Sequence, residues 1–162
     1  WPGRVKSPGT ASAEASMRAV RALGFAAGLH TAGIYPQRLQ QVLPLVDWVG
    51  FDVKAQLDDA QAYSRITARP NVCGQVARSL EYILAAGVAY EVRTTIHPDW
   101  LGEEDLARLA AGLERSGVSR WVLQKARPVG GQRLAAADNF PCKPLLDDWQ
   151  RRFAAFEVRS DV

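Results

Sequence analysis

The fold is decided by residues 72–97, which read VCGQVARSLEYILAAGVAYEVRTTIH. From Val76 to Leu84 the apolar side chains recur at three- and four-residue spacing, which predicts a helix with one buried face. Gly87 is suited to end that helix. From Val88 to His97 apolar and polar residues alternate, which is typical of a β-strand. A helix that leads directly into a strand is the repeating unit of an α/β protein, so we expect parallel strands covered by helices.

The same alternation of elements extends over most of the chain. Outward from this unit, further strands are predicted at Phe25 to Thr31, Trp48 to Lys54 and Trp121 to Lys125. Helices are expected at about residues 13–23, 36–43, 72–86, 103–116 and 144–156, with Asn71 as the N-cap of the third. Four strands are too few to close a barrel. We therefore expect an α/β fold with a parallel sheet and outer helices, either open or forming a partial TIM-like (β/α) barrel arc of about four strands.

The composition argues against several kinds of partner and site. The net charge of +3 is spread along the 162 residues rather than gathered in a basic run, so no nucleic-acid partner is expected. No apolar stretch approaches the length of a membrane span, and the amino end lacks the features of a signal peptide. We therefore expect a cytoplasmic protein without a membrane partner. Cys73 and Cys142 are far apart and form no CxxC or CxxxCxxC spacing, so no metal site is predicted.

The predicted strands end in polar residues, and parallel α/β folds bind ligands at the carboxyl ends of their strands. Asp52 and Lys54 are two residues apart and so share one face of a strand, on which Gly50 leaves room. An acid and an amine side by side suit a zwitterionic ligand, and an internal salt bridge accounts for the spacing equally well. Arg93 either lines a cavity or pairs with Glu91, which shares its strand face.

His30 and His97 are the two histidines of the chain, each at a predicted strand end. Two histidines in one cleft could share a metal ion, but no third ligand is evident. We expect instead that one histidine is hydrogen-bonded and the other is exposed.

Four segments at these strand ends resemble radical S-adenosylmethionine enzymes, and most closely the activating proteins of anaerobic ribonucleoside-triphosphate reductase. The segments are LHTAGIYP (29–36), VDWVGFDVKA (46–55), YEVRTTIHP (90–98) and LQKARP (123–128). Their joint occurrence in this order is more specific than any one of them, and the likeness covers about residues 13–133. The resemblance implies a partial (β/α)6 barrel, of which this chain would supply the third to sixth strands.

The same resemblance implies an activity and a ligand. Such enzymes cleave S-adenosylmethionine reductively with a [4Fe–4S] cluster, and the activating proteins generate a glycyl radical on a partner enzyme. The family's TNG-like turn corresponds to residues 31–33, with Ala32 in place of the usual asparagine. The residues that would contact S-adenosylmethionine are Thr31, Gly33, Asp52, Lys54, Arg93, Gln124 and Arg127.

The chain departs from the family at two motifs. It has no CxxxCxxC to hold the cluster and no GGE to meet the ligand's amino group. We therefore expect residues 12–162 to be the carboxyl-side part of such a barrel, preceded by a disordered or non-native leader at residues 1–11. This part alone should be inactive, with no [4Fe–4S] cluster, no catalytic residue assigned and weak binding of S-adenosylmethionine at best.

The alternative is a non-catalytic α/β module that binds a small ligand or associates with itself. In a barrel arc, the strand Phe25 to Thr31 lacks a neighbour and exposes unpaired backbone groups. Residues 25–29 carry neither a charge nor a proline to discourage pairing. We therefore expect a homodimer or larger assembly through this edge or through the inner face of the arc.

Overall fold

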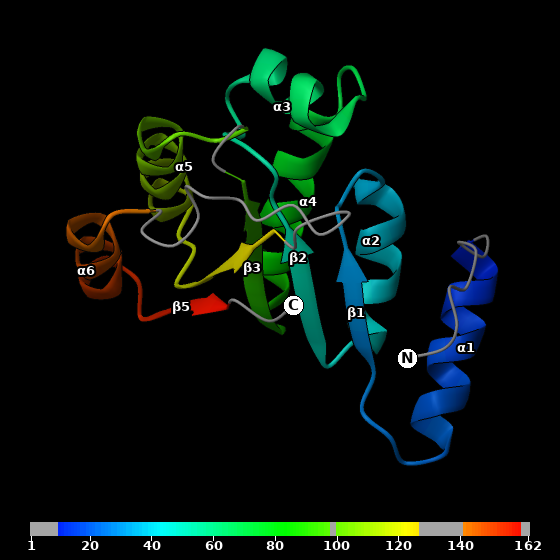
Figure 1. Cartoon of the computed structure of the whole chain (residues 1–162). Helices are drawn as coiled ribbons and strands as arrows, with labels where there is room; N and C mark the ends of the chain where they lie inside the picture. Colours follow the sequence, from blue (N-terminus) through cyan, green and yellow to red (C-terminus); the bar gives the residue numbers. More distant parts are fainter. Residues whose placement is uncertain (1–9, 98–99, 127–140, 160–162) are drawn as a thin grey trace, which may run out of the picture.

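The computed structural model describes residues 10–97, 100–126 and 141–159, and it has the α/β fold expected from the sequence (Figure 1). Within these residues, five strands form one all-parallel sheet in the order β1-β2-β3-β4-β5. The strands are β1 (Gly28–Thr31), β2 (Trp48–Asp52), β3 (Ala89–Ile96), β4 (Arg120–Lys125) and β5 (Ala155–Arg159). The helices are α1 (Thr10–Ala22), α2 (Pro36–Val42), α3 (Ala60–Thr67), α4 (Cys73–Ala86), α5 (Glu103–Arg115) and α6 (Lys143–Arg152), with a 3-10 turn, η1 (Leu43–Leu45), before β2. None of the described helices is long and apolar enough to cross a membrane.

Each strand is hydrogen-bonded to the next strand along the chain. Parallel neighbours need crossover connections, and crossovers of one hand bring their helices to the same face of the sheet. Figure 1 looks onto the opposite face, with α4 lying behind β2 and β3. This arrangement is common to an open sheet and to an arc of a (β/α) barrel.

The core lies between the sheet and the helices. On β2, the side chains of Val49 and Phe51 are fully buried on the helix-covered face, while Trp48 and Asp52 are partly exposed on the other. The predicted helix stripes pack against this face. Their buried members are Val76, Leu80 and Ile83 of α4 and Leu106, Leu109 and Leu113 of α5.

The fifth strand corrects the prediction for the carboxyl end. The last helix was expected to run to Phe156, but α6 ends at Arg152 and β5 begins at Ala155. Phe153 between them has extended backbone, with φ −99° and ψ 137°. Phe156 then lies in register with Trp121 of β4, and their ring centroids are 5.5 Å apart. The aromatic cluster predicted as part of the core is therefore built from a helix and a strand together.

The segment between β2 and α4 also differs from the prediction. α3 is a separate helix that begins after Asp59, whose carboxylate accepts a hydrogen bond from the backbone N–H of Ala62 at 2.8 Å. Asn71 is not the N-cap of α4. Its backbone is left-handed, with φ 59°, and Val72 occupies the cap position.

The amino-terminal elements begin at residues other than those predicted. α1 begins at Thr10, inside the range assigned to the leader, and residues 1–9 lie outside the described residues. β1 begins at Gly28 rather than at Phe25. Before β1, the carboxylate of Asp47 accepts hydrogen bonds from the backbone N–H of Ala27 at 2.7 Å and from Arg21 at 3.0 Å. These bonds tie the loop that follows α1 to the start of β2.

Candidate functional site

Asp52, Lys54 and Arg93 meet where β2 and β3 end. The register of the two strands places Asp52 directly beside Arg93, on the face of the sheet that carries no described helix. Arg93 approaches Asp52 Oδ1 at 2.9 Å through Nε and at 2.8 Å through a terminal nitrogen. Lys54 Nζ lies 3.1 Å from Asp52 Oδ2. The predicted convergence of these three side chains is present, and we call them the strand-end cluster.

Each member of the strand-end cluster has an ion-pair partner within the cluster. Asp52 and Lys54 do form an internal salt bridge. Arg93 does not pair with Glu91, because Arg159 of β5 holds both Glu91 oxygens, at 2.9 Å and 3.1 Å. One carboxylate between two cations leaves the cluster with one net positive charge, so a carboxylate or phosphate would be attracted to it.

Gly50 makes room for the cluster. A Cβ at this position would lie 2.7 Å from the ring of Trp48, 2.8 Å from His30 Nδ1 and 3.0 Å from Arg93 Cζ. The glycine therefore allows His30 Nδ1 and a terminal nitrogen of Arg93 to approach to 2.6 Å. His30 is thus hydrogen-bonded, as expected for one of the two histidines.

His97 lies at the end of β3, where its ring stacks on Trp100 with centroids 4.9 Å apart. It is half-buried rather than exposed as expected. Among the described residues, no three His, Cys, Asp or Glu side chains gather closely enough to hold a metal ion.

Thr31 and Gly33 form a tight turn after β1. The Thr31 hydroxyl accepts a hydrogen bond from the backbone N–H of Gly33 at 3.1 Å. Gly33 has φ 68°, and a Cβ there would collide with the ring of Phe51. Its carbonyl accepts a hydrogen bond from Ser79 of α4 at 2.6 Å. These contacts give both predicted residues a structural role in holding the turn against the core.

Gln124 lies on the same sheet face as the strand-end cluster and is buried. The register places it between Thr95 of β3 and Arg159 of β5. Arg127 and the Gly-Gly turn after it lie outside the described residues.

A cavity of about 410 Å³ adjoins the strand-end cluster at the carboxyl ends of β1, β2 and β3. Lys54 belongs to both the cluster and the cavity wall. α3 and the segment after it form the opposite side. The lining residues are Ala32, Ile34, Lys54, Tyr63, Ile66, Thr67, Arg69, Val72, Thr95 and Trp100. A mostly apolar hollow with two charged side chains in its wall, Lys54 and Arg69, suits a small organic ligand.

Among the residues that line this cavity, only Lys54 was a predicted ligand contact, and Tyr63 and Trp100 are two that the sequence analysis missed. Tyr63 is buried, and burial raises its pKa to about 12, so its hydroxyl stays neutral and accepts a hydrogen bond from the backbone N–H of Lys54 at 3.3 Å. Asp59 is a favourable N-cap residue, and Tyr63 and Ile66 after it have the three-residue spacing of one helix face. Together these features could have predicted α3 and its inner face. Trp100, 57% exposed, follows β3 and has no comparable signal.

The cysteines do not fit an iron–sulfur cluster. The Cys73 thiol lies 2.8 Å from the carbonyl oxygen of Leu57, and burial raises its pKa, which disfavours the thiolate that binds iron. Cys142 is the N-cap residue of α6. Two cysteines on separate elements cannot supply the three or four thiolates of such a site.

The geometry thus combines a charged cluster with an adjoining cavity at the ends of three parallel strands. No protein-family model matches the chain, and no curated protein matches it.

Proposed function

We propose that this chain is the carboxyl-side arc of a radical S-adenosylmethionine activating enzyme, and that its part is to hold S-adenosylmethionine at the strand ends. The observation that carries the proposal is the position of the Asp52 carboxylate between Lys54 and Arg93, beside a cavity of about 410 Å³. The resemblance of the strand-end segments to that family supports the same assignment.

The chemistry of the ligand matches the cluster. The methionyl end of S-adenosylmethionine carries an ammonium group and a carboxylate. The ammonium group can pair with Asp52, and the carboxylate can pair with Lys54 and Arg93, so each internal ion pair is replaced by one of similar strength. The side chains of Asp52, Lys54 and Arg93 are 27%, 30% and 13% exposed, which leaves them reachable while limiting solvent screening.

The rest of the ligand would occupy the cavity beneath α3. The volume lies within the roughly 300–1,000 Å³ of small-molecule sites. Trp100 offers a partly exposed aromatic face at the cavity, and the neutral Tyr63 lies inside it. Aromatic faces favour flat heterocycles such as adenine.

Reductive cleavage of the ligand requires an iron–sulfur cluster, which the residues of this chain do not fit. The proposal therefore assigns no step of the cleavage to this chain. In the proposed family, the whole enzyme acts on a glycine of a glycyl-radical partner, and the described residues would contribute ligand binding.

Calorimetric titration with S-adenosylmethionine tests the proposal. We expect a Kd between about 10 μM and 1 mM. Binding should be this weak because the sequence has neither the CxxxCxxC nor the GGE motif, which contribute contacts to the ligand in that family. Lys54→Met and Arg93→Met should each weaken binding by about tenfold or more, since each removes a charge that faces the carboxylate. Lys143→Met is the matched control, because Lys143 lies on α6 with its side chain 82% exposed. Absence of binding, or binding that neither cluster variant weakens, would contradict the proposal.

A self-associating module is the second candidate, and a different observation favours it. β1 forms one edge of the sheet among the described strands. Immediately before it, Leu23 and Phe25 are 74% and 67% exposed. An unpaired edge beside exposed apolar side chains is a typical surface for association between copies.

A further inference from the structure

His30 of β1 reaches across β2 to Arg93 of β3. In the register of the sheet, His30 lies beside Gly50, and Gly50 lies beside the residue two before Arg93. Neighbouring strands are about 4.8 Å apart, so the backbones of β1 and β3 are separated by roughly 10 Å. The two side chains span this distance because Gly50 has no side chain between them, and His30 Nδ1 lies 2.6 Å from a terminal nitrogen of Arg93. The proposed function gives His30 no role.

The contact fixes the protonation state of His30. A guanidinium has only N–H donors, so the ring nitrogen that faces Arg93 must be the acceptor. His30 Nδ1 therefore carries no proton, and the ring is the neutral tautomer with its proton on Nε2. The ring meets that of Trp48 edge-on, at an interplanar angle of 69°, which helps to hold its orientation. His30 is thus a neutral acceptor of defined orientation next to the strand-end cluster.

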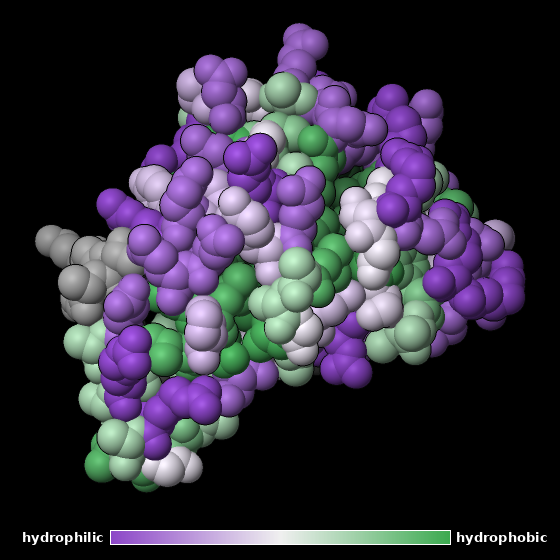
Figure 2. Space-filling model, turned by 180° about the vertical axis from the view of Figure 1, so that it is seen from behind, coloured by the Kyte–Doolittle hydropathy of each residue, from purple (hydrophilic) through white to green (hydrophobic). Residues whose placement is uncertain are grey.

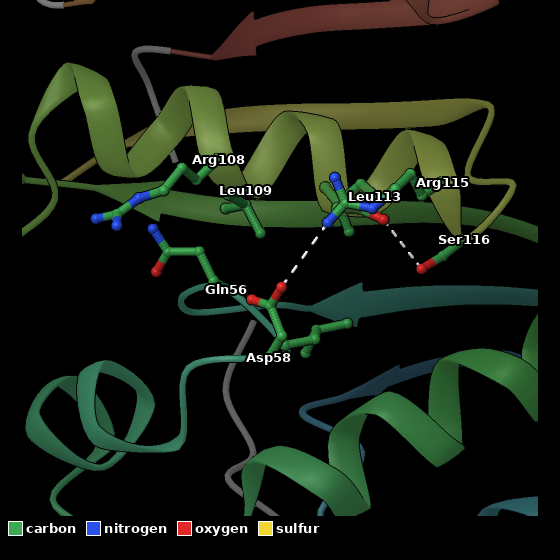
Figure 3. A pocket seen from close by; sticks show the side chains of 9 residues that line it. Gln56, Asp58, Arg108, Leu109, Leu113, Arg115 and Ser116 are labelled. Atoms are coloured by element: carbon green, nitrogen blue, oxygen red, sulfur yellow. Dashed lines mark hydrogen bonds and ion pairs between the residues drawn. The ribbon is translucent and has the colours of Figure 1, made fainter.

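Arg93 is held from two sides. Its Nε and one terminal nitrogen contact Asp52 Oδ1 at 2.9 Å and 2.8 Å, and its other terminal nitrogen contacts His30. The Arg93 side chain is 13% exposed, which limits competition from water. Arg115 and Asp58, which line a separate cavity next to α5, show the contrast, since they lie 3.7 Å apart with side chains 67% and 77% exposed (Figure 3). Such an exposed pair contributes little, whereas the partners of Arg93 determine where its guanidinium lies.

Ligand binding affects the two partners of Arg93 differently. In the proposed function, the ammonium group of S-adenosylmethionine pairs with Asp52, which weakens the hold of Asp52 on Arg93. The single lone pair of His30 Nδ1 is already used by Arg93, and the neutral ring has no charge that attracts the ammonium group. The hydrogen bond between His30 and Arg93 can therefore persist, and the ligand's carboxylate meets a guanidinium that still has one fixed partner.

We propose that His30 is the positioning residue of Arg93, and that its neutral imidazole keeps the guanidinium at the strand ends when Asp52 pairs with a ligand. The identity of that ligand rests on the proposed function, whereas the contact between His30 and Arg93 rests on the described geometry.

Nitrogen NMR spectra of the imidazole groups test the contact without any ligand. At about pH 8, where histidine is neutral, His30 Nδ1 of the wild type should be an unprotonated nitrogen whose resonance is shifted by its hydrogen bond. Asp52→Asn removes the carboxylate charge, much as pairing with an ammonium group neutralises it, and should leave this resonance in place. Arg93→Met should move the resonance to the position of a free acceptor nitrogen. Arg120→Met is the matched control, since Arg120 is exposed at the start of β4, and it should change nothing.

Calorimetric titration of His30 variants with S-adenosylmethionine tests the positioning role. His30→Leu has no acceptor and should weaken binding by about tenfold or more, as expected for the loss of a hydrogen bond to a charged group. His30→Asn places an amide oxygen near the position of Nδ1, so it should bind within about threefold of the wild type. Rescue by asparagine, which does not restore the ring contact with Trp48, separates positioning from packing.

The proposal is overturned if Arg93→Met leaves the His30 Nδ1 resonance unchanged, or if Asp52→Asn shifts it as far as Arg93→Met does. It is also overturned if His30→Leu and His30→Asn bind S-adenosylmethionine equally well. If the wild type binds no S-adenosylmethionine, the proposed function fails, and the imidazole spectra still decide whether His30 holds Arg93.

Discussion

Gly50 sets the geometry of the strand-end cluster at the scale of a single atom. Its missing side chain leaves space that Trp48, His30 and Arg93 share. The ring of His30 meets that of Trp48 edge-on, with centroids 5.2 Å apart, so the three side chains fill one site on the sheet. The position of Arg93 therefore depends on a residue that has no charge and no hydrogen-bonding side chain.

We predict that Gly50→Ala destabilises the protein by about 1–3 kcal/mol, because the added methyl overpacks this site. It should also weaken S-adenosylmethionine binding, since Arg93 must move. Urea unfolding and calorimetry measure the two effects. In the matched control Gly28→Ala, on β1, the new Cβ meets Trp48 at an ordinary 3.7 Å, and stability should change little. Equal stabilities of the two variants would show that the site at Gly50 is not tightly packed.

The buried hydroxyl of Tyr63 leads to a prediction at alkaline pH. Its pKa is raised to about 12 by burial, against about 10 in an unfolded chain. The unfolded state therefore releases this proton first, and stability falls from about pH 10 to about pH 12, by roughly 2–3 kcal/mol in total. Tyr63→Phe should lose this alkaline decline in urea unfolding, and Tyr35→Phe, on an exposed residue, should retain it. A decline unchanged in Tyr63→Phe would mean that Tyr63 is not its source.

At the residue scale, the sequence predicted part of the site. The pairing of Asp52 with Lys54 follows from their two-residue spacing, which is local. The partner of Arg93 does not follow from local spacing, because two carboxylates, those of Glu91 and Asp52, compete for its guanidinium. Arg159 decides that competition by binding Glu91, and Arg159 lies on a strand that the pattern did not reveal.

At the element scale, α5 shows how one carboxylate can organise a helix start. Asp105 Oδ2 accepts a hydrogen bond from the backbone N–H of Gly102 at 3.0 Å, and its other oxygen accepts from Arg108 at 2.7 Å. Burial alone would raise the pKa of Asp105. The hydrogen bonds from Arg108, Gly102 and Gln56 outweigh it and hold the pKa below its usual value.

We predict that Asp105→Ala lowers stability by about 1–2 kcal/mol at neutral pH, through loss of this helix cap. Because the pKa of the folded state is lowered, the contribution of Asp105 is fully present above its unfolded pKa of about 3.9 and is lost as the pH falls through the folded value. The difference in free energy of unfolding between the wild type and the variant, measured by urea unfolding, should therefore become smaller at acidic pH. The control is Glu104→Ala, on an exposed neighbour in the same helical turn. A gap that stays constant down to about pH 2 would contradict the role of the ionised carboxylate.

The helices and strands were predictable in those segments where a single hydrophobic periodicity, helical or alternating, dominates. α4, β3 and α5 follow clean helical or alternating patterns, and the observed burial matches them except at Glu91 of β3, which is buried beside Arg159. At the carboxyl end, Trp149, Phe153 and Phe156 fit a helical spacing as well as a helix that turns into a strand. The alternation of Phe156 and Val158 with charged residues, which indicates β5, spans too few residues to outweigh that spacing.

At the scale of the whole molecule, β1 and the end of α1 form an apolar margin of the described surface. Figure 2 shows apolar atoms at the lower left, where α1 ends and the chain turns toward β1. The exposed apolar side chains there are Val20, Leu23 and Phe25. A second copy placed against this margin would cover both the side chains and the open edge of β1.

We predict that the protein forms a homodimer or larger assembly through this margin. Substitution of both Leu23 and Phe25 by lysine should weaken association at least a hundredfold, since burying each side chain contributes about 1.5–3 kcal/mol. Sedimentation across a dilution series measures this, with Tyr35→Lys, 56% exposed at another site, as the control. A monodisperse wild-type monomer at high concentration would contradict the prediction.

The central claim is that the carboxyl ends of β1, β2 and β3 form a site for S-adenosylmethionine. The most direct test is to titrate the protein with S-adenosylmethionine and to follow the amide and indole NMR resonances. We predict saturable shifts at Ala32, Lys54, Thr95 and the Trp100 indole. Shifts that miss these four residues, or no saturable shift at any concentration, would contradict it.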